Sequence, residues 1–466
     1  MKRIAYLFFP FVLLLLSACD KDDDPRNDDR PTTLAWIEDT MREHYYWNDK
    51  IPAANKLSYT ADPEDFFTSI LYKAEDGKTR NGVHHYFSYI KKATDATRQG
   101  SIQEDYSYGF EFTSVLFTNN GSNYYGSLVL YVLPNTPAQK AGLKRGDWIL
   151  KINNKNMTTT SEVASLAGDV AKTFTVYQYS STNGFVDART VNISAAEPVN
   201  YSPIYQHKVF SIGAKKVGYL VYDTFTAGVD DNDKSFDNKL RSLSTNEFNG
   251  VNEFILDLRY NNGGYLSCAR LLCAILGPSK VLSEKQFGYL EYNNGSKGYF
   301  SVTGDLGNGK NMNLQRLFVL VSSSSASSSE AVISLLAPYM DVVVIGEVTL
   351  GKNVGSETYT SSDKEWEMQP ITVKIFNSLN RSDYANGWIP DFAKGDVFER
   401  NNQGYVTLQE DIRELGDPNE RLLSIALGVI NGTYSSNSVR LGSTANAYQE
   451  GPNSLERRAT NGVIID

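Results

Sequence analysis

The stretch Leu317-Phe318-Val319-Leu320-Val321-Ser322-Ser323-Ser324-Ser325-Ala326-Ser327-Ser328-Ser329-Glu330 joins an apolar run to a serine-rich turn. A second stretch, Val342-Val343-Val344-Ile345-Gly346-Glu347-Val348-Thr349-Leu350-Gly351-Lys352, joins an apolar run to a glycine-rich turn. Such runs predict buried strands of a parallel sheet. Because parallel strands end at one edge of a sheet, Ser327 and Lys352 can meet there. The pair predicts a serine nucleophile with a lysine general base, although a serine-rich run alone could be a flexible loop.

A lysine base is expected because the chain has only 4 histidines, and none lies in either stretch. A serine–histidine–aspartate triad could still be assembled by folding. The ordinary lysine pKa is about 10.4, and lowering it to about 7 costs roughly 4–5 kcal/mol. Burial in an apolar site can supply that shift, because desolvation disfavours the charged amine. The apolar residues before Lys352 therefore predict a shielded site.

The two stretches resemble the C-terminal processing peptidases, also called tail-specific proteases. That family has Ser-Ala-Ser-x-Ser-Glu, then Gly-Glu-x-Thr-x-Gly-Lys, with the lysine 25 residues after the serine, as here. The resemblance implies that Ser327 is the nucleophile and Lys352 the base. Many members place a glutamine four residues after the lysine to orient it, and this chain has Ser356 there. Ser356 is the expected third member, with a shorter reach, while a carboxylate from Glu357 would raise the lysine pKa.

A third motif predicts the oxyanion hole. Asp257-Leu258-Arg259-Tyr260-Asn261-Asn262-Gly263-Gly264 matches the family's Asp-Leu-Arg-x-Asn-x-Gly-Gly loop. Glycines let the backbone approach a substrate closely, and a helix beginning nearby adds partial positive charge. The resemblance assigns one donor to Gly263, with Gly264 close behind. We expect the second donor to be the backbone N–H of Ser328, which follows the nucleophile at a helix start.

Residues 103–198 resemble a PDZ domain. The evidence is a Gly-aromatic loop followed by Pro137-Ala138-Gln139-Lys140-Ala141-Gly142-Leu143-Lys144-Arg145-Gly146-Asp147-Trp148-Ile149-Leu150-Lys151-Ile152-Asn153. Such a module binds a peptide by adding it as a strand to an open sheet edge, while loop N–H groups hold its terminal carboxylate. A generic β-hairpin segment is the alternative. The expected peptide-binding residues are Tyr108, Gly109, Phe110, Glu111 and Phe112.

The resulting fold class is a multidomain α/β protein with a small N-terminal helical domain, a PDZ domain and a peptidase core. Strand–helix–strand repeats over residues 205–433 predict a largely parallel sheet with a closing helix. The resemblance, rather than periodicity, implies a crotonase/ClpP-like α/β core. Helical spacing over residues 31–95 predicts the N-terminal domain. Residues 434–466 are rich in Ser, Asn, Gly and Thr and predict a loose, polar C-terminal tail.

Residues 1–18 read as a lipoprotein signal peptide. Lys2 and Arg3 precede an apolar run, and Leu16-Ser17-Ala18-Cys19 resembles a bacterial lipobox. We expect lipidation at Cys19, an acidic tether over residues 19–30, and a lipid anchor in the outer membrane, on the periplasmic face or the cell surface. An ordinary signal peptide with a chance cysteine is the alternative.

Other features limit the function classes. The net charge is −9, from 45 basic and 54 acidic residues, and no dense basic patch suggests nucleic acid as a partner. The chain has no CxxC or HExxH motif, so we expect no metal and no cofactor. Cys268 and Cys273 lie five apart in a predicted helix, on different faces, and should be buried apolar residues rather than a disulfide.

The sequence therefore predicts a serine endopeptidase of the bacterial cell envelope. Its PDZ domain would capture protein or peptide substrates with free C-termini, and the core would cut them nearby. Two alternatives stay open. A relative with the same fold could have lost turnover and act as a peptide-binding lipoprotein, which Ser356 favours. The lipobox and the aromatic content would also fit a glycan- or nutrient-binding surface lipoprotein.

Overall fold

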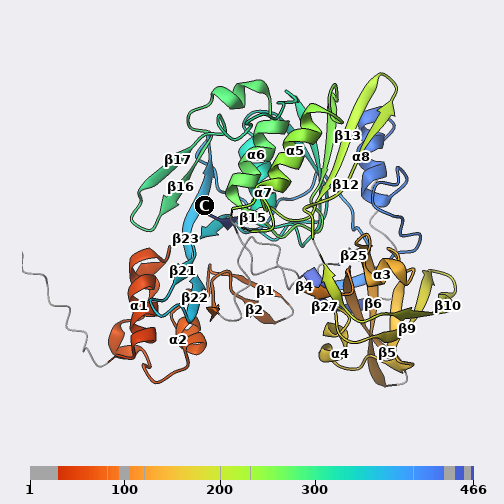
Figure 1. Cartoon of the computed structure of the whole chain (residues 1–466), viewed down its shortest axis with the longest axis horizontal. Helices are drawn as coiled ribbons and strands as arrows, with labels where there is room; N and C mark the ends of the chain where they lie inside the picture. The colour runs from red at the N-terminus through yellow and green to blue at the C-terminus, as the bar shows by residue number, and fades with distance from the viewer. Residues whose placement is uncertain are drawn as a thin grey trace, which may run out of the picture.

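The structure is a computed structural model that describes residues 30–80, 82–93, 105–119, 121–199, 201–230, 232–401, 403–434, 447–455 and 463–465. The expected signal peptide, Cys19 and most of the expected tether lie outside the described residues. Among the helices of the described part, none is long and apolar enough to cross a membrane. Figure 1 shows three regions, with the N-terminal unit and the PDZ domain side by side below a larger peptidase core.

The N-terminal unit is built on helices α1 (Thr32–His44) and α2 (Pro63–Ser69). Their apolar faces form one buried cluster, whose members include Ile37, Met41 and Phe66. Three short strands accompany the helices: β1 (Lys78–Arg80), β2 (Val83–His85) and β3 (Tyr89–Lys92). Strand β3 pairs with β22 (Trp366–Gln369), which pairs with β21 (Tyr359–Thr360). The helical prediction is therefore incomplete, because the strands attach this unit to the core.

The PDZ domain contains a mixed set of strands and two short helices. They are β4 (Asp105–Ser107), β5 (Phe110–Asn119), β6 (Ser122–Val132), α3 (Pro137–Lys140), β7 (Trp148–Ile152), β8 (Lys155–Asn156), α4 (Thr160–Ala164), β9 (Lys172–Ser180), β10 (Gly184–Ile193) and β11 (Glu197–Val199). Two further strands, β25 (Phe398–Arg400) and β26 (Tyr405–Leu408), extend its sheet, and β27 (Tyr448–Asn453) lies between β26 and β5. The strand order is β10-β9-β7-β6-β5-β27-β26-β25, with β8 beside β7.

The main core sheet has the order β12-β13-β14-β18-β19-β24. Its strands are β12 (Ile204–Ile212), β13 (Lys215–Tyr222), β14 (Glu253–Asp257), β18 (Arg316–Val321), β19 (Asp341–Gly346) and β24 (Phe392–Ala393). Strands β13 to β24 pair in parallel, and only β12 is antiparallel. The prediction of a largely parallel sheet is therefore confirmed.

Both faces of this sheet are covered, which explains its continuous apolar strands. Helices α5 (Ser235–Thr245), α6 (Leu266–Leu276) and α7 (Ser328–Leu336) lie on one side, and α8 (Arg421–Asn431) lies on the other (Figure 1). Side chains of β13 alternate between them: Leu220 packs in the cluster that includes α6 and α7, and Tyr219 packs in the cluster that includes α8. Cys268 and Cys273 are buried on α6, as small apolar residues should be.

A second six-stranded sheet was not expected from the sequence. Its order is β15-β28-β20-β23-β16-β17. The strands are β15 (Gly264–Tyr265), β28 (Val463–Ile464), β20 (Val354–Ser356), β23 (Ile371–Asn377), β16 (Gly288–Tyr292) and β17 (Lys297–Phe300). Strands β27 and β28 both come from the region that we expected to be a loose tail. That expectation is wrong for residues 448–453 and 463–464, because they form backbone ladders with two different sheets.

Candidate active site

Ser327 occupies a sharp turn between β18 and α7. Its backbone has φ 63° and ψ −114°, a conformation that a residue with a side chain adopts only under strain. The side chain is fully buried, and its Oγ has no hydrogen-bond partner among the described residues. A strained, unpaired hydroxyl between a strand and a helix is the geometry of a nucleophile elbow.

Lys352 lies on the turn after the neighbouring strand β19. Strands β18 and β19 pair in parallel from Arg316 with Asp341 to Val321 with Gly346, so both turns leave the same edge. Only 2% of the lysine surface is exposed. Burial lowers the pKa of Lys352 to about 8, although nearby carboxylates act in the opposite direction. The prediction of a shielded lysine is thus met by the fold, and an appreciable fraction of the amine is neutral near pH 8.

The N-terminal unit completes the surroundings of Lys352. The amine nitrogen lies 4.7 Å from the centre of the Phe87 ring. Asp76 is buried in the same unit, where it accepts hydrogen bonds from the backbone N–H groups of Phe87 and Ser88 at 2.9 and 3.0 Å. Asp76 is also the strongest influence that raises the Lys352 pKa against the effect of burial. No sequence pattern pointed to Asp76 or Phe87, because both come from a different domain.

Glu330 links the turn that carries Ser327 to the turn that carries Lys352. Its Oε2 accepts the backbone N–H of Ser327 at 2.9 Å and that of Lys352 at 2.8 Å. Its Oε1 accepts the N–H of Gly351 at 2.7 Å and the hydroxyl of Thr349. The carboxyl is fully buried, and burial raises its pKa. The sequence motif assigned no role to Glu330, although its Ser-x-x-Glu spacing is that of a capping box and could have indicated one.

Ser356 lies on β20 and is buried, but its hydroxyl is directed to other partners than Lys352. Its Oγ is 3.2 Å from Oε1 of Gln369 and 3.3 Å from the carbonyl oxygen of Val463. Gln369, on β22, is fully buried beside it. We expected Ser356 to orient Lys352, but the hydrogen bonds of its hydroxyl in this structure go to Gln369 and Val463 instead.

The loop that carries Gly263 approaches Ser327 closely. A Cβ on Gly263 would lie 2.7 Å from Cβ of Ser327, and the backbone φ of Gly263 is +117°, so glycine is required there. The N–H of Gly263 donates to Oδ1 of Asn261 at 2.9 Å. Gly264 begins strand β15, and its carbonyl accepts the hydroxyl of Ser328 at 2.7 Å. Ser328 opens α7, so its N–H is among the first-turn donors that have no partner within the helix.

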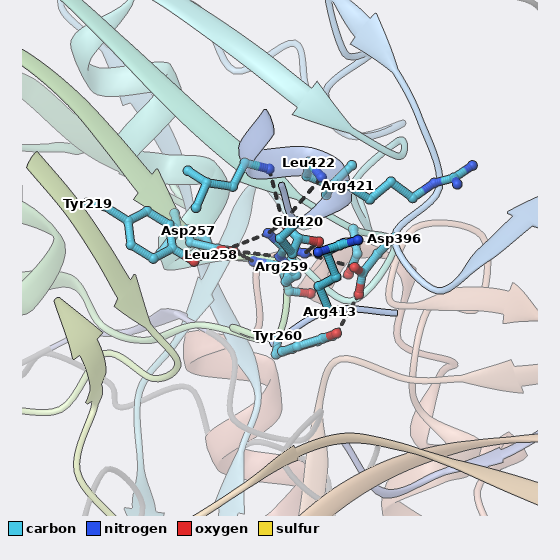
Figure 2. A network of polar contacts seen from close by, with 12 residues as sticks. Tyr219, Asp257, Leu258, Arg259, Tyr260, Asp396, Arg413, Glu420, Arg421 and Leu422 are labelled. Atoms are coloured by element: carbon cyan, nitrogen blue, oxygen red, sulfur yellow. Dashed lines mark hydrogen bonds and ion pairs between the residues drawn. The ribbon is translucent and has the colours of Figure 1, made fainter. Parts of the chain in front are cut away.

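A buried charge network lies directly before the oxyanion loop (Figure 2). Arg259 donates to both oxygens of Asp257 at 2.9 and 2.8 Å, and to both oxygens of Glu420 at 2.7 and 2.9 Å. It also donates to Asp396 at 2.8 Å. Burial alone would raise the pKa of Asp396, but the neighbouring guanidinium groups lower it to about 2. Asp396 is therefore ionised, and its hydrogen bonds with Arg259 and Tyr260 fix the chain just before Gly263.

Arg145 connects the PDZ domain to this network. It donates to Asp396 at 2.7 Å and to the hydroxyl of Tyr260, which belongs to the oxyanion loop. It also donates to the carbonyl of Leu130 on β6 at 2.8 Å. The PDZ motif thus contributes a buried cation to the base of the active site.

The predicted peptide-binding loop is placed differently from the expectation. Tyr108, Phe110 and Phe112 have their side chains in the PDZ core, with at most 2% exposed, so they do not face a ligand. Gly109 has a φ of +82°, and its N–H donates to Ser107. Glu111 is buried and accepts a hydrogen bond from Ser454. The edge of β5 that a peptide would join is paired with β27.

Three of the four histidines have other partners in the structure. Ring nitrogens of His84 lie 2.9 Å from the carbonyl of Asp76 and 3.1 Å from the hydroxyl of Thr79. His207 pairs with Glu247, and His44 stacks on Tyr359. Folding therefore brings Lys352 beside the turn that carries Ser327, while these three histidines have their partners elsewhere.

Comparison with protein families agrees with this geometry. Residues 216–393 match the model described as peptidase family S41, residues 33–89 match the S41 N-terminal domain, and residues 128–176 match a PDZ domain. The chain belongs to peptidase family S41. The S41 core match spans both Ser327 and Lys352, and the loop at Gly263.

The chain is similar to individual carboxyl-terminal-processing proteases. It is 27% identical over 266 residues to a carboxyl-terminal-processing protease of a Picosynechococcus strain, covering 56% of this chain and 59% of that protein. It is 29% identical over 271 residues to the chloroplastic carboxyl-terminal-processing peptidase 1 of Arabidopsis thaliana, covering 57% and 51%. The chain thus matches between half and three fifths of the length of these curated relatives.

A solved structure of an S41 protease from Bacteroides fragilis is similar over most of the S41 chain. The TM-score is 0.72 at 28% identity, and the match covers 86% of this chain and 98% of that one. The arrangement of N-terminal domain, PDZ domain and peptidase core is therefore shared with a solved S41 protein.

Proposed function

We propose that this protein is a serine endopeptidase that cleaves proteins near their C-termini, with Ser327 as nucleophile and Lys352 as general base. One observation carries the proposal. Lys352 is buried, burial lowers its pKa to about 8, and a single carboxylate holds its turn against that of the strained Ser327. The processing proteases among its relatives support the substrate class.

The proposed reaction is acyl transfer through the Ser327 hydroxyl. The neutral amine of Lys352 accepts the Oγ proton while Oγ forms a bond to the scissile carbonyl carbon. The charged lysine then returns a proton to the leaving amine, the peptide C–N bond breaks, and an acyl-enzyme remains. Water attacks this ester with Lys352 again as base, which releases the second product and restores the hydroxyl.

The oxyanion would be held by backbone N–H groups. The N–H of Ser328 lies at the start of α7, where the helix adds partial positive charge. The N–H of Gly263 now points to Asn261, so its peptide unit has to turn before it can donate to an oxyanion. Gly264 follows with a φ of +132°, and such glycine backbones permit that change.

Substrate capture by the PDZ domain is proposed to use strand addition at the edge of β5. In the described state this edge carries β27, with Gln449 opposite Leu116 and Asn453 opposite Thr113. A peptide can join β5 only after β27 has left. Capture and displacement of β27 are therefore one step in this proposal.

A second candidate is a catalytically inactive, peptide-binding protein of the same fold. The contact that favours it is the hydrogen bond from Gly263 to Asn261, because it leaves one expected oxyanion donor occupied. Loss of one such donor costs about 3–4 kcal/mol of barrier, enough to reduce turnover greatly.

Casein digestion by the purified full chain separates the two candidates. Wild type should cut, and Ser327→Ala and Lys352→Ala should not, while circular dichroism shows that both variants remain folded. Wild type that leaves casein and peptides with free apolar C-termini intact would favour the binding protein. Activity that survives in Ser327→Ala would exclude the proposed nucleophile.

The cellular location is also proposed, from the lipobox at Cys19 alone. Wild type should fractionate with membranes, and Cys19→Ala should not. Protease accessibility on whole cells would then distinguish the cell surface from the periplasmic face.

A further inference from the structure

Two strands from the last part of the described chain occupy two sites that a peptide substrate would use. Strand β27 pairs antiparallel with β5, the edge proposed for peptide capture. Strand β28 pairs in parallel with both β15 and β20, which flank the catalytic turns. Figure 1 shows the end of the chain beside β15, whereas β27 lies in the PDZ sheet. We call residues 447–455 and 463–465 the tail segment.

Specific contacts hold the first part of the tail segment against the β5 edge of the PDZ sheet. Arg400 pairs with Glu450 through two contacts of 2.6 and 3.2 Å. The ring of Tyr448 packs edge-on against Phe117, with centroids 5.0 Å apart. Ser454 then accepts the N–H of Phe112 at 2.8 Å, a backbone donor at the start of the predicted peptide-binding strand. The β5 edge is thus covered by a strand of the same chain.

The tail segment next passes the oxyanion loop. The carbonyl of Leu455 accepts a hydrogen bond from Nδ2 of Asn262 at 3.1 Å. Asn262 directly precedes Gly263, whose Cβ position would lie 2.7 Å from Ser327. Leu455 itself is 2% exposed. The segment therefore runs from the β5 edge of the PDZ sheet to the loop that carries Gly263.

The second part of the tail segment is a strand that lies between β15 and β20 and pairs with both. Val463 lies opposite Gly264 on one side and Gly355 on the other, and its side chain is fully buried. The N–H of Ile465 donates to the carbonyl of Ser356 at 3.1 Å, and the Ser356 hydroxyl lies 3.3 Å from the Val463 carbonyl. An extended peptide with a small β-branched apolar residue is the ligand that these contacts fit.

We propose that the tail segment is an intramolecular occupant of both peptide sites, which keeps substrate out until it is displaced. The same contacts assign a subsite at Val463, between Gly264 and Gly355, to a small β-branched apolar side chain of an extended peptide. Since β28 lies beside the proposed peptidase site, the inference rests on the proposed function. It adds a resting state in which the enzyme competes with its own chain.

A binding experiment tests this without requiring turnover. The probe is a fluorescein-labelled synthetic peptide with the sequence of residues 459–466, measured by fluorescence polarisation against the full chain carrying Ser327→Ala. A second protein carries Val463→Asp in addition, which places a charge in the buried subsite and should release β28. We expect the probe to bind the double variant at least about tenfold more tightly, because the competing strand is no longer in place.

A matched control adds the same charge elsewhere. Val209 lies on β12 with 43% of its surface exposed, so Val209→Asp in the Ser327→Ala chain should bind the probe as weakly as Ser327→Ala alone. A probe in which the valine is replaced by lysine should bind neither protein. Equal affinity of the original probe for the Ser327→Ala chain and the Val463→Asp double variant would overturn the proposal.

Casein digestion then separates this inference from the proposed function. With Ser327 restored, Val463→Asp should cut casein at least about tenfold faster than wild type. If the probe binds as expected but neither protein cuts casein, the peptidase proposal fails, and the proposal that the tail segment occupies the peptide site is supported. If wild type cuts casein and Val463→Asp neither binds the probe more tightly nor cuts faster, the occupant proposal fails and the peptidase stands.

Discussion

Replacing Lys352 with methionine should stabilise the protein while it removes the proposed base. The amine is 2% exposed, and burial lowers its pKa from 10.5 to about 8. A lowered lysine pKa means that the folded protein disfavours the charged form. At pH 7 the folded chain nevertheless carries the charge, so the wild-type protein is destabilised by the buried ammonium group.

The size of the effect follows from the lowered pKa. A fall of the pKa from 10.5 to about 8 corresponds to about 3 kcal/mol. Methionine also gives up the contact between the amine and the Phe87 ring at 4.7 Å, which offsets about 1 kcal/mol. The expected net gain of Lys352→Met in the free energy of unfolding is therefore about 2 kcal/mol at pH 7.

The stability difference between the two proteins depends on pH. Below pH 8 both the folded and the unfolded wild type hold the proton, so the whole penalty is present. Between pH 8 and 10.5 the unfolded chain binds more protons, so wild-type stability rises with pH in that window. The advantage of Lys352→Met should shrink by about 1 kcal/mol between pH 7 and pH 9.

Urea unfolding followed by tryptophan fluorescence measures this difference. Lys285 is exposed, so Lys285→Met serves as a matched control and should change neither the stability nor its pH dependence. A Lys352→Met protein that is less stable than wild type at pH 7 would refute the reasoning. So would an advantage that stays constant from pH 7 to pH 9.

Four further measurements follow from the same site. Because Lys352 must be neutral to act, kcat/KM for a peptide substrate should rise with pH and reach half its maximum near pH 8, which a pH–rate profile checks. Glu330→Gln removes a carboxylate that raises the lysine pKa, so the midpoint of that profile should move to lower pH. Its kcat should also fall, because the amide nitrogen cannot accept two of the four hydrogen bonds that the carboxylate accepts. Gly263→Val should reduce turnover at least about 100-fold in a steady-state assay, because its side chain would collide with Ser327. Arg145→Leu should lower the free energy of unfolding in urea by about 3–5 kcal/mol, because it leaves the buried Asp396 short of a partner.

The sequence was sufficient where a local signal was strong. Apolar runs such as Leu317–Val321 predicted strands of the main sheet because they are buried on both faces. The residues around Ser327 and Lys352 could be placed at one edge because each follows such a run. The PDZ domain was recognisable from its long motif, which ends in the buried strand β7.

Other parts of the site had no signal that a single sequence could give. Strand β20 has three residues and β28 has two, too few for any periodicity. Their pairing depends on contacts between positions more than 100 residues apart, such as Gly355 with Val463. Asp76 reaches Lys352 only because a separate domain packs there. Strand β27 reads as a loop from its composition, and the backbone ladders with β5 and β26 override that preference.

The position of β27 in the PDZ sheet has a consequence for how the chain acquires its structure. Strand β5 is complete once residue 119 has been made, but its partner begins at Tyr448. More than 300 residues must emerge before that edge is covered, and an uncovered strand edge is a template for association with other chains. During synthesis this edge of β5 is therefore open to association with other strands until β27 has been made. Truncations that stop before residue 448 should aggregate even though the sequence motifs of every domain are present.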